Sequence, residues 1–306
     1  MKIFIVILNW NRVKDTIECL RSCEKLKRGK AKLSLVLVDN ASTDESQKKL
    51  KKLKFGNGEY VYIQNKENLG YAGGNNVGIR YALNNKADYV IVLNNDTIVD
   101  KNLIYEFLKT ARGYPKAGIL TPKIYFAKGF EFHDDRYKKN ELGKVLWYAG
   151  GKIDWDNVYG MNRGVDEVDK GQFDKEEEVD FATGTCMFMR SKALKQIGVF
   201  DEKYFMYLED VDLCVRMRRV GWKVLYSPKG KLWHKVAQSS RIGSDLNDYY
   251  IHRNRLLFGM RYASVRTKFA LLRESIRFVI NGRKSQKQGV IDFYLAKFGK
   301  GLENNY

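Results

Sequence analysis

The chain has 306 residues, of which 44% are hydrophobic and 30% charged, a globular composition with enough apolar residues for a large core. Only three prolines occur, which argues against a Pro-rich linker, and no run of about 18 apolar residues predicts a membrane-spanning helix. The net charge of +19 predicts attraction to anions, whether nucleotides, acidic polymers, nucleic acid or an anionic membrane surface.

The cysteines show neither a C-x-x-C motif nor a paired framework, which is typical of the reduced thiols of an intracellular protein and predicts a cytoplasmic location. Cys19 and Cys23 lie one helical turn apart, and packing explains the pair more simply than metal binding. The apolar residues 1–8 are interpreted as a buried strand, because residues 9–12 follow them without a signal-peptide cleavage site.

Apolar runs alternate with amphipathic stretches over the first 110 residues. The order of elements is strand, helix, strand, helix, and it predicts a parallel sheet with right-handed crossovers. The predicted strands are 3–8, 33–38, 60–64 and 89–93, and the predicted helices are 13–26, 46–53, 74–84 and 103–112.

Three of these four strands end in a polar residue: Asn9, Asp39 and Asn94. Open α/β sheets bind their ligands at the carboxyl ends of the strands, so we expect a site there. The run Asn94-Asn95-Asp96 ends in a carboxylate, whose hard oxygens suit a divalent cation that carries a phosphate. Ordinary turn chemistry is the alternative explanation for this run.

Residues 70–78 are rich in glycine and are predicted to form a loop that opens a helix. Glycines let backbone N–H groups approach a phosphate or ribose closely. The spacing matches neither the dinucleotide-binding motif nor the P-loop motif, so those two ligand classes are not indicated. A tight turn before the helix is the simpler alternative.

The pattern becomes less regular after about residue 115. Residues 128–140 are predicted to be a loop and residues 146–161 a short hairpin. The further predicted strands are 184–190 and 224–227, and the further predicted helices are 192–197, 208–220, 249–262 and 267–280.

Glu209 and Asp210 fall in the first turn of a predicted helix, where carboxylates complement the helix dipole. Asp212 and Arg216 are one turn apart and are interpreted as a pair on the helix surface. The residues before this helix are unusually aromatic, which suggests a pocket wall that holds a sugar or raises the pKa of a carboxyl group. These aromatic residues are Tyr204, Phe205 and Tyr207.

His234 follows the last predicted strand directly. Its neutral imidazole can bind a divalent metal, and a structural role is the alternative. The last 66 residues contain 13 Lys and Arg against 5 Asp and Glu, which indicates either a solvated helical face or a surface that docks on an anionic membrane. The cations concerned are Arg241, Arg253, Arg255, Arg261, Arg266, Lys268, Arg273 and Arg277.

Five motifs, taken in this order, resemble the family 2 glycosyltransferases and most closely their rhamnosyltransferase-like branch. They lie at residues 9–11, 38–44, 68–75, 93–96 and 209–212. The resemblance covers about residues 1–240 and implies the GT-A fold, a Rossmann-like, mostly parallel sheet flanked by helices. It implies a catalytic domain over 1–240, with a nucleotide-sugar half at about 1–112 and an acceptor half at about 113–240. Residues 241–306 then form a basic helical extension.

The resemblance also implies roles for single residues. Asp210 would be the general base, supported by Glu209, and Asp96 with His234 would bind Mg²⁺ or Mn²⁺. Asp39 would contact a pyrimidine ring, and Gly184-Thr185 would lie near the donor sugar and the acceptor. The residues expected to contact the nucleotide-sugar are Asn9, Asn11, Asp39, Asn40, Asp44, Asn68, Gly70, Gly73, Asn75, Asn94, Asn95, Asp96 and Arg253.

One position departs from the family pattern. Asn94 stands where the first Asp of the D-x-D motif is expected, and an amide oxygen coordinates or accepts hydrogen bonds without carrying a charge. Metal binding should therefore depend more on the phosphates of the nucleotide. The branch tolerates Asn at this place, so the change does not indicate an inactive protein.

The resemblance implies an inverting, metal-dependent transfer from dTDP-rhamnose or a UDP-hexose to a glycan or lipid-linked acceptor, in the synthesis of cell-surface polysaccharide. A cytoplasmic enzyme at the inner face of the membrane is expected; the sequence predicts no oligomeric state. A non-catalytic nucleotide-sugar-binding relative is the alternative. A specific nucleic-acid-binding protein is not indicated because no known module appears. A nucleotidyltransferase would carry a glycine-rich basic loop where residues 9–12 stand.

Overall fold

The computed structural model describes residues 1–236 and 244–301. Arg241, one of the cations named above, lies outside the described residues. The described chain is built around a ten-stranded sheet in which eight strands follow the order β10-β12-β6-β11-β4-β1-β2-β3, while β5 pairs with β12 and β7 with β6. Strands β8 and β9 form a separate hairpin.

The strands of the structure have the following bounds: β1 (Lys2–Asn9), β2 (Lys32–Asp39), β3 (Glu59–Gln64), β4 (Tyr89–Asn94), β5 (Thr97–Val99), β6 (Ala117–Phe126), β7 (Leu146–Tyr148), β8 (Gly151–Asp154), β9 (Tyr159–Asn162), β10 (Glu177–Glu178), β11 (Cys186–Arg190) and β12 (Lys223–His234). The helices are α1 (Val13–Glu24), α2 (Ser46–Leu50), α3 (Gly70–Asn84), α4 (Leu103–Gly113), the 3-10 turn η1 (Asp134–Arg136), α5 (Ser191–Ile197), α6 (Glu209–Arg219), α7 (Asp245–Tyr262), α8 (Val265–Asn281) and α9 (Lys284–Tyr294).

The N-terminal half is the parallel sheet that the alternating pattern predicts. Strand β1 pairs in parallel with β2 on one side and β4 on the other, and β3 extends the sheet beyond β2. The Ile, Val and Leu residues at the centres of β1, β2 and β4 are buried on both faces, as a parallel sheet covered by helices requires, whereas the edge strand β3 is half-buried. The four cysteines are buried and free, in agreement with the packing interpretation.

The second half contains a strand that the sequence pattern missed. All ten residues of β6 are buried, although Lys123 lies at its centre. The ammonium of Lys123 is fully buried and is paired with Asp169 at 2.9 Å and Asp174 at 2.5 Å, so its charge is neutralised inside the protein. A charged residue within an apolar run interrupts the hydrophobic pattern by which a buried strand is predicted from sequence.

Strand β11 runs antiparallel to both of its neighbours, β4 and β6, and joins the two halves into one mixed sheet. Strand β12 is much longer than the predicted 224–227, because the pairing with β6 resumes after an irregularity between Ser227 and Lys231. His234 is therefore the last residue of a strand and does not lie beyond it, which corrects the prediction.

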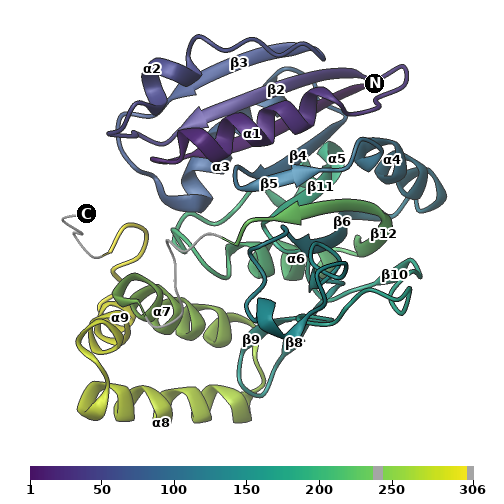
Figure 1. Ribbon diagram of the computed structural model, residues 1–306. Helices are drawn as coiled ribbons and strands as arrows, with labels where there is room; N and C mark the ends of the chain where they lie inside the picture. Colours follow the sequence, from purple (N-terminus) through teal and green to yellow (C-terminus); the bar gives the residue numbers. More distant parts are fainter. Residues whose placement is uncertain (237–243, 302–306) are drawn as a thin grey trace.

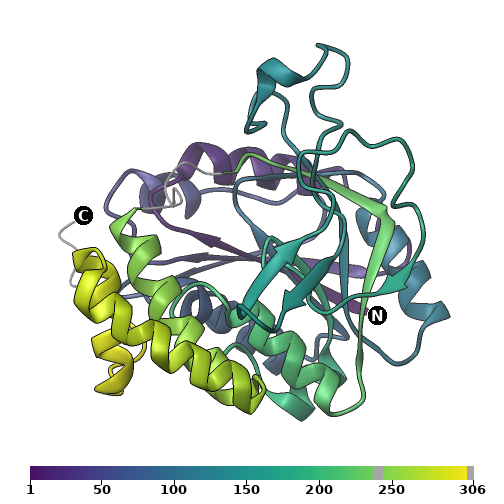
Figure 2. The ribbon, with the colours of Figure 1, turned by 90° about the horizontal axis from the view of Figure 1, so that it is seen from below.

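The C-terminal helices pack below the sheet in the view of Figure 1. Helix α9, which the sequence did not predict, packs against α7 and α8. Figure 2, seen from below, shows α8 and α9 at the outer surface of this layer. Across the described residues, every helix is too short or too polar to cross a membrane.

Candidate active site

The carboxyl ends of the parallel strands bring the predicted polar residues together. In the register of the sheet, Asn9 lies opposite Asp39, and Leu8 lies opposite Asn94. The side-chain nitrogen of Asn9 donates to Asp39 Oδ2 at 2.8 Å and to Ser42 Oγ at 3.0 Å. Asp39 also accepts from the backbone and the hydroxyl of Ser42. The side chains of Asn9 and Asp39 thus hold the loop after β2 in place.

Asp39 is fully buried, so its carboxylate presents no surface to a ligand in this structure. Its contact with a pyrimidine ring stays a prediction. Asn11 acts on the same loop from the other side, because its Oδ1 accepts from the backbone nitrogens of Thr43 at 2.8 Å and Asp44 at 3.3 Å. The carboxylate of Asp44 is exposed and caps the nitrogen of Ser46.

Asn40 is the centre of a second group of amides. Its Nδ2 donates to Asn68 Oδ1 at 2.8 Å and to the carbonyl of Gly70 at 3.1 Å. Its Oδ1 accepts from Asn65 Nδ2 and from the nitrogen of Leu69. This amide is fully occupied within the protein, and it ties the loop after β2 to the start of α3.

The glycine-rich segment is not the predicted loop, because α3 already begins at Gly70. The reason for the glycines is close packing. A Cβ at Gly74 would lie 2.5 Å from the side chain of Leu8, and a Cβ at Gly78 would lie 2.3 Å from that of Val6. Gly73 and Gly70 are equally confined, so contacts of these glycines with a phosphate stay predictions. Asn75, one turn into α3, is buried and its Oδ1 has no partner among the described residues.

Asp96 and His234 meet because β5 pairs antiparallel with β12, which places His234 opposite Thr97. Asp96 Oδ1 lies 3.1 Å from His234 Nε2, and both side chains are buried. Burial raises the pKa of the Asp96 carboxyl, but the attraction of His234 and Arg12 outweighs burial and leaves that pKa below its ordinary value. The residue is therefore an anion at neutral pH.

A path of backbone contacts links this pair to the acidic end of α6. The nitrogen of Asn94 donates to the carbonyl of Thr185, the residue before β11. The adjacent nitrogen of Gly184 donates to Asp210 Oδ2 at 2.8 Å. The hydroxyl of Tyr71 donates to the carbonyl of Gly184 at 2.5 Å. The predicted segment Gly184-Thr185 therefore lies between the two groups of carboxylates.

Glu209 and Asp210 are an unequal pair. Glu209 is buried and its Oε2 has no partner among the described residues, whereas Asp210 is partly exposed and its two oxygens accept from the nitrogens of Gly184 and Val211. Burial and the charge of Asp210 raise the pKa of the Glu209 carboxyl well above its ordinary value. Burial raises the pKa of Asp210 as well, against the pull of those two hydrogen bonds. Asp210 is the carboxylate that an acceptor can reach.

Comparison with known proteins identifies the family of the chain. A family model described as Glycosyl transferase family 2 matches residues 4–198, which is more than half of the sequence. The chain belongs to glycosyl transferase family 2. The predicted resemblance is thereby confirmed.

Two relatives in this family and one solved structure illustrate the likeness. The chain is 28% identical over 224 residues to the low-salt glycan biosynthesis hexosyltransferase Agl10 of Haloferax volcanii, covering 72% of this chain and 66% of that protein. It is 32% identical over 157 residues to the N-acetylglucosaminyl-diphospho-decaprenol L-rhamnosyltransferase of Mycobacterium tuberculosis, covering 50% of this chain and 48% of that protein. The match thus spans from half to two thirds of the relatives' length.

The solved structure of GalNAc-T7 with UDP, GalNAc and Mn²⁺ superposes with a TM-score of 0.60 at 14% identity, over 90% of this chain and 57% of that one. At this identity the superposition shows the fold alone. It confirms the predicted GT-A fold class of this family 2 glycosyltransferase, with its mostly parallel sheet and a helical C-terminal region.

Asp96 and His234 are the two side chains here whose chemistry would suit a metal ion. His234 Nδ1 has no hydrogen-bond partner among the described residues, and Asp96 Oδ1 has only its contact with His234. The described residues bring no third His, Cys, Asp or Glu to this pair. One carboxylate and one imidazole suit a cation that keeps its other ligands from phosphates and water, which is how Mg²⁺ is usually held. Asn94 is half-buried beside them, and Asn95 Nδ2 donates to Thr16 Oγ1 at 2.9 Å.

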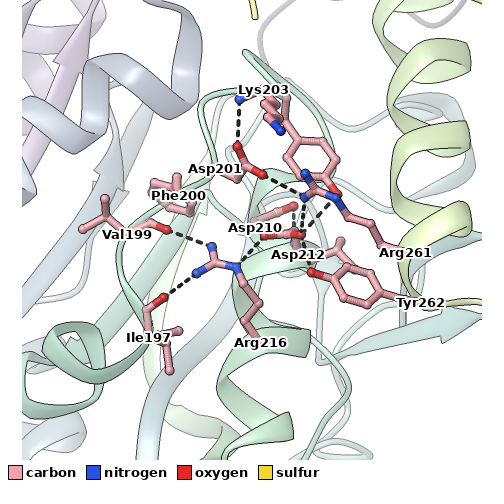
Figure 3. Close-up of polar contacts among 12 residues, drawn as sticks. Ile197, Val199, Phe200, Asp201, Lys203, Asp210, Asp212, Arg216, Arg261 and Tyr262 are labelled. Atoms are coloured by element: carbon pink, nitrogen blue, oxygen red, sulfur yellow. Dashed lines mark hydrogen bonds and ion pairs between the residues drawn. The ribbon is translucent and has the colours of Figure 1, made fainter. Parts of the chain in front are cut away.

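Asp212 is a buried hub and not the surface residue that the helical spacing suggested. Its Oδ2 accepts from Arg216 at 2.7 Å, and its Oδ1 accepts from Tyr262 at 2.7 Å, Tyr204 at 3.1 Å and Arg261 at 3.3 Å. Figure 3 shows the two guanidinium groups converging on this one carboxylate. Because Arg261 and Tyr262 come from α7, Asp212 fastens α6 to the C-terminal helices.

Arg253 does not fit the prediction that it approaches a diphosphate. The side chain is fully buried, and its guanidinium donates to the carbonyls of Gly299, Lys203 and Tyr204 and to the side chains of Asn254 and Tyr249. All its donors are used inside the protein. The family resemblance implied a ligand contact for Arg253, whereas the carbonyl groups that take its donors are distant in the chain and were not visible from the sequence.

Arg253 and Asn254 instead hold the loop that leads into α6. Asn254 Nδ2 donates to the carbonyls of Tyr204, Met206 and Tyr207 at 2.7 to 3.0 Å. Three non-glycine residues of this loop have left-handed backbone conformations, each costing about 1–3 kcal/mol. They are Phe205, Tyr207 and Leu208. Helix α7 thus maintains the strained turn from which Glu209 and Asp210 start.

Two further residues of the site were not singled out from the sequence. Thr16 Oγ1 donates to Asn9 Oδ1 at 2.7 Å and accepts from Asn95, so it connects the ends of β1 and β4. Burial raises the pKa of the Tyr71 phenol most. The negative charges of Glu209 and Asp210, and more weakly that of Asp96, raise it further. Tyr71 lies in the 68–75 motif, and a phenol inside that motif was the feature of the sequence that could have indicated it as a site residue.

Proposed function

We propose that this protein transfers a sugar from a pyrimidine nucleoside-diphosphate sugar, dTDP-rhamnose or a UDP-hexose, to a hydroxyl group of a glycan or lipid-linked acceptor. The observation that carries the proposal is one reachable carboxylate, Asp210, which is connected through Gly184-Thr185 and Asn94 to the strand end that carries a second anionic site at Asp96. The relatives named hexosyltransferase and rhamnosyltransferase support the reaction class. The work of such an enzyme is the building of cell-surface glycans.

In the proposed reaction Asp210 removes the proton from the acceptor hydroxyl as that oxygen attacks the anomeric carbon. The nitrogens of Gly184 and Val211 keep the two carboxylate oxygens oriented. The raised pKa of Asp210 makes it a stronger base than a solvated aspartate. Attack on the face opposite the leaving diphosphate inverts the anomeric centre. Glu209 supports Asp210 from the buried side.

Asp96 and His234 would hold Mg²⁺ or Mn²⁺, with further ligands from the diphosphate. A divalent cation at this place supplies Lewis-acid stabilisation of the leaving nucleoside diphosphate. The low pKa of Asp96 keeps that carboxylate charged for the purpose. Because Asn94 carries no charge, the protein would supply one carboxylate ligand to the cation. The diphosphate of the nucleotide would supply the remaining negative charge. We place the enzyme in the cytoplasm, at the inner face of the membrane.

The deciding experiment pairs donor binding with turnover. UDP-, dTDP- and GDP-sugars are titrated by calorimetry with Mn²⁺ or Mg²⁺, and transfer or slow donor hydrolysis is then followed with the donor that binds. Replacement Asp210→Asn should lower turnover about 10³-fold, within the usual range for a general base, and leave the donor Kd unchanged.

The matched control is Asp88→Asn, an exposed carboxylate just before β4 and at the opposite end of that strand from Asn94, which should keep near-native turnover. Near-native turnover of Asp210→Asn would show that the base is another residue. Binding of a donor without turnover by the unaltered protein, with a range of acceptors supplied, would indicate a nucleotide-sugar-binding relative.

A further inference from the structure

Helix α8 carries apolar residues on its outer face as well as on its inner one. Its inner face includes Leu271 and Phe278, which pack on Gly259 and His252 of α7, beside the buried Thr267 and Ser275. Figures 1 and 2 both place α8 on the outside of the C-terminal layer, away from the sheet. An amphipathic helix of a globular protein normally turns its apolar stripe toward the core.

A second apolar stripe of α8 points outward. Val265, Phe269, Ile276 and Ile280 are each between 60% and 70% exposed. Their spacing of four, seven and four residues places them on one face of an α-helix. Four large apolar side chains in one line, uncovered by any described residue, indicate a surface that meets an apolar medium.

Positive charge borders this stripe. Three exposed arginines lie along one edge of the stripe: Arg266, Arg273 and Arg277. On an α-helix each of them projects on the same side of the stripe, beside one of its apolar residues. Residues 265–295 contain seven Lys and Arg and only two acidic residues. Neither acidic residue opposes this charge: Glu274 pairs with Arg255 of α7 at 2.8 Å, and Asp292 is buried, where it accepts from Tyr249.

The end of α9 continues the same surface. The hydroxyl of Tyr294 lies 2.6 Å from Ser275 Oγ of α8, while its ring is exposed. Leu295 beside it is exposed as well. A tyrosine with a bonded hydroxyl and an exposed ring is typical of the boundary between lipid and water.

We propose that the stripe of α8, its bordering arginines and the end of α9, together called the α8 surface, dock on an anionic lipid bilayer. The helix would lie in the plane of the interface, with the stripe in the acyl boundary and the arginines at the head groups. A second copy of this chain fits less well, because pairing two α8 surfaces brings arginines of like charge together. Nucleic acid would leave the apolar stripe unsatisfied.

Only the purpose of this docking rests on the proposed function: it would bring the active site to an acceptor that is anchored in lipid. The docking itself is a property of α8 and is measured without donor or acceptor. A failure of the α8 surface and a failure of the proposed reaction are therefore distinguishable.

The test is co-sedimentation of the full chain with vesicles of phosphatidylcholine, with and without phosphatidylglycerol. The unaltered protein should bind the anionic vesicles and bind less at high salt. The double replacement Phe269→Glu with Ile276→Glu should weaken this binding about tenfold or more, and Arg273→Glu with Arg277→Glu should do the same for anionic vesicles.

Tyr105→Glu, an equally exposed apolar residue on α4, is the matched control and should leave vesicle binding unchanged. Donor hydrolysis should be the same in all four proteins, which shows that each is folded. Equal vesicle binding by the Phe269/Ile276 variant would overturn the proposal. So would self-association of the unaltered protein in light scattering that only this variant removes, because the partner would then be a second copy.

Discussion

The two groups of polar residues at this sheet edge differ in how their hydrogen bonds are used. In the loops after β1 and β2, the side chains of Asn9, Asp39 and Asn40 find their hydrogen-bond partners within the protein and are nearly closed to solvent. On the other side, His234 and Glu209 keep atoms without a partner among the described residues, and Asp210 is open to solvent. Satisfied polar networks give a loop its shape, whereas unsatisfied buried groups with shifted pKa values indicate chemistry.

The same contrast distinguishes two carboxylates that lie within one turn of α6. Asp210 faces the site, while Asp212, two residues on, is fully buried and satisfied by two arginines and two tyrosines. A carboxylate of the first kind should affect turnover when it is changed, and one of the second kind should affect stability. The predictions below test this division, beginning with the largest expected effect.

Replacement Asp212→Asn should lower the free energy of unfolding by about 3 kcal/mol, because Arg216 and Arg261 lose the buried charge that pairs with them. Urea unfolding measures the change. Asp201→Asn is the matched control, since Asp201 also accepts from Arg261 but is partly exposed, and its loss should be well under half as large. Equal losses in the two variants would show that Asp212 is not the hub.

Replacement Asn9→Ala should cost about 2 kcal/mol of stability, because it removes one buried hydrogen-bond partner from Asp39 and one from Thr16. Asn84→Ala, at an exposed position near the end of α3, should cost little. Urea unfolding is compared with the KM for the donor. If Asn9→Ala raises the KM with unchanged stability, Asn9 contacts the nucleotide and the contrast drawn above does not hold for it.

Replacement Glu209→Gln should change how stability depends on pH. The folded-state pKa of Glu209 is raised above its ordinary value of 4.5, so the stability associated with its bound proton is complete below that value and is lost as pH rises through the raised pKa. Glutamine is neutral throughout. The difference in unfolding free energy should therefore move in favour of the variant with rising pH, by about 1.4 kcal/mol for each pH unit that separates the folded-state pKa from the unfolded-state pKa.

This difference is followed by urea unfolding of both proteins from pH 4 to about pH 9. Titrating groups distant from Glu209 are common to the two proteins and cancel in the comparison, and Asp210 is the neighbour whose titration changes with the replacement. A difference that stays constant across this range would mean that Glu209 is not held in its protonated form by burial and by Asp210.

Local signals in the sequence determined the N-terminal sheet, since β1, β2, β3 and β4 are uninterrupted apolar runs with helices between them. The family resemblance also singled out Asp96, Asp210 and His234, because the residue types and their order are visible in the chain, and their roles in the reaction stay predictions. The acidic pair at the start of α6 followed from the same motifs.

Only the tertiary structure decided the course of the remaining strands and the partners of the buried charged residues. Strand β6 was concealed by Lys123, whose two acidic partners come from a distant loop. The roles of Asp212 and Arg253 depended on α7, which the sequence could not dock on α6. Close packing around the glycines of α3, against β1 at Gly74 and Gly78 and against Phe205 at Gly70, was also visible only in the structure. Periodicity reports the surroundings of a residue along its own element, whereas burial, pairing and charge compensation depend on residues far away in the chain.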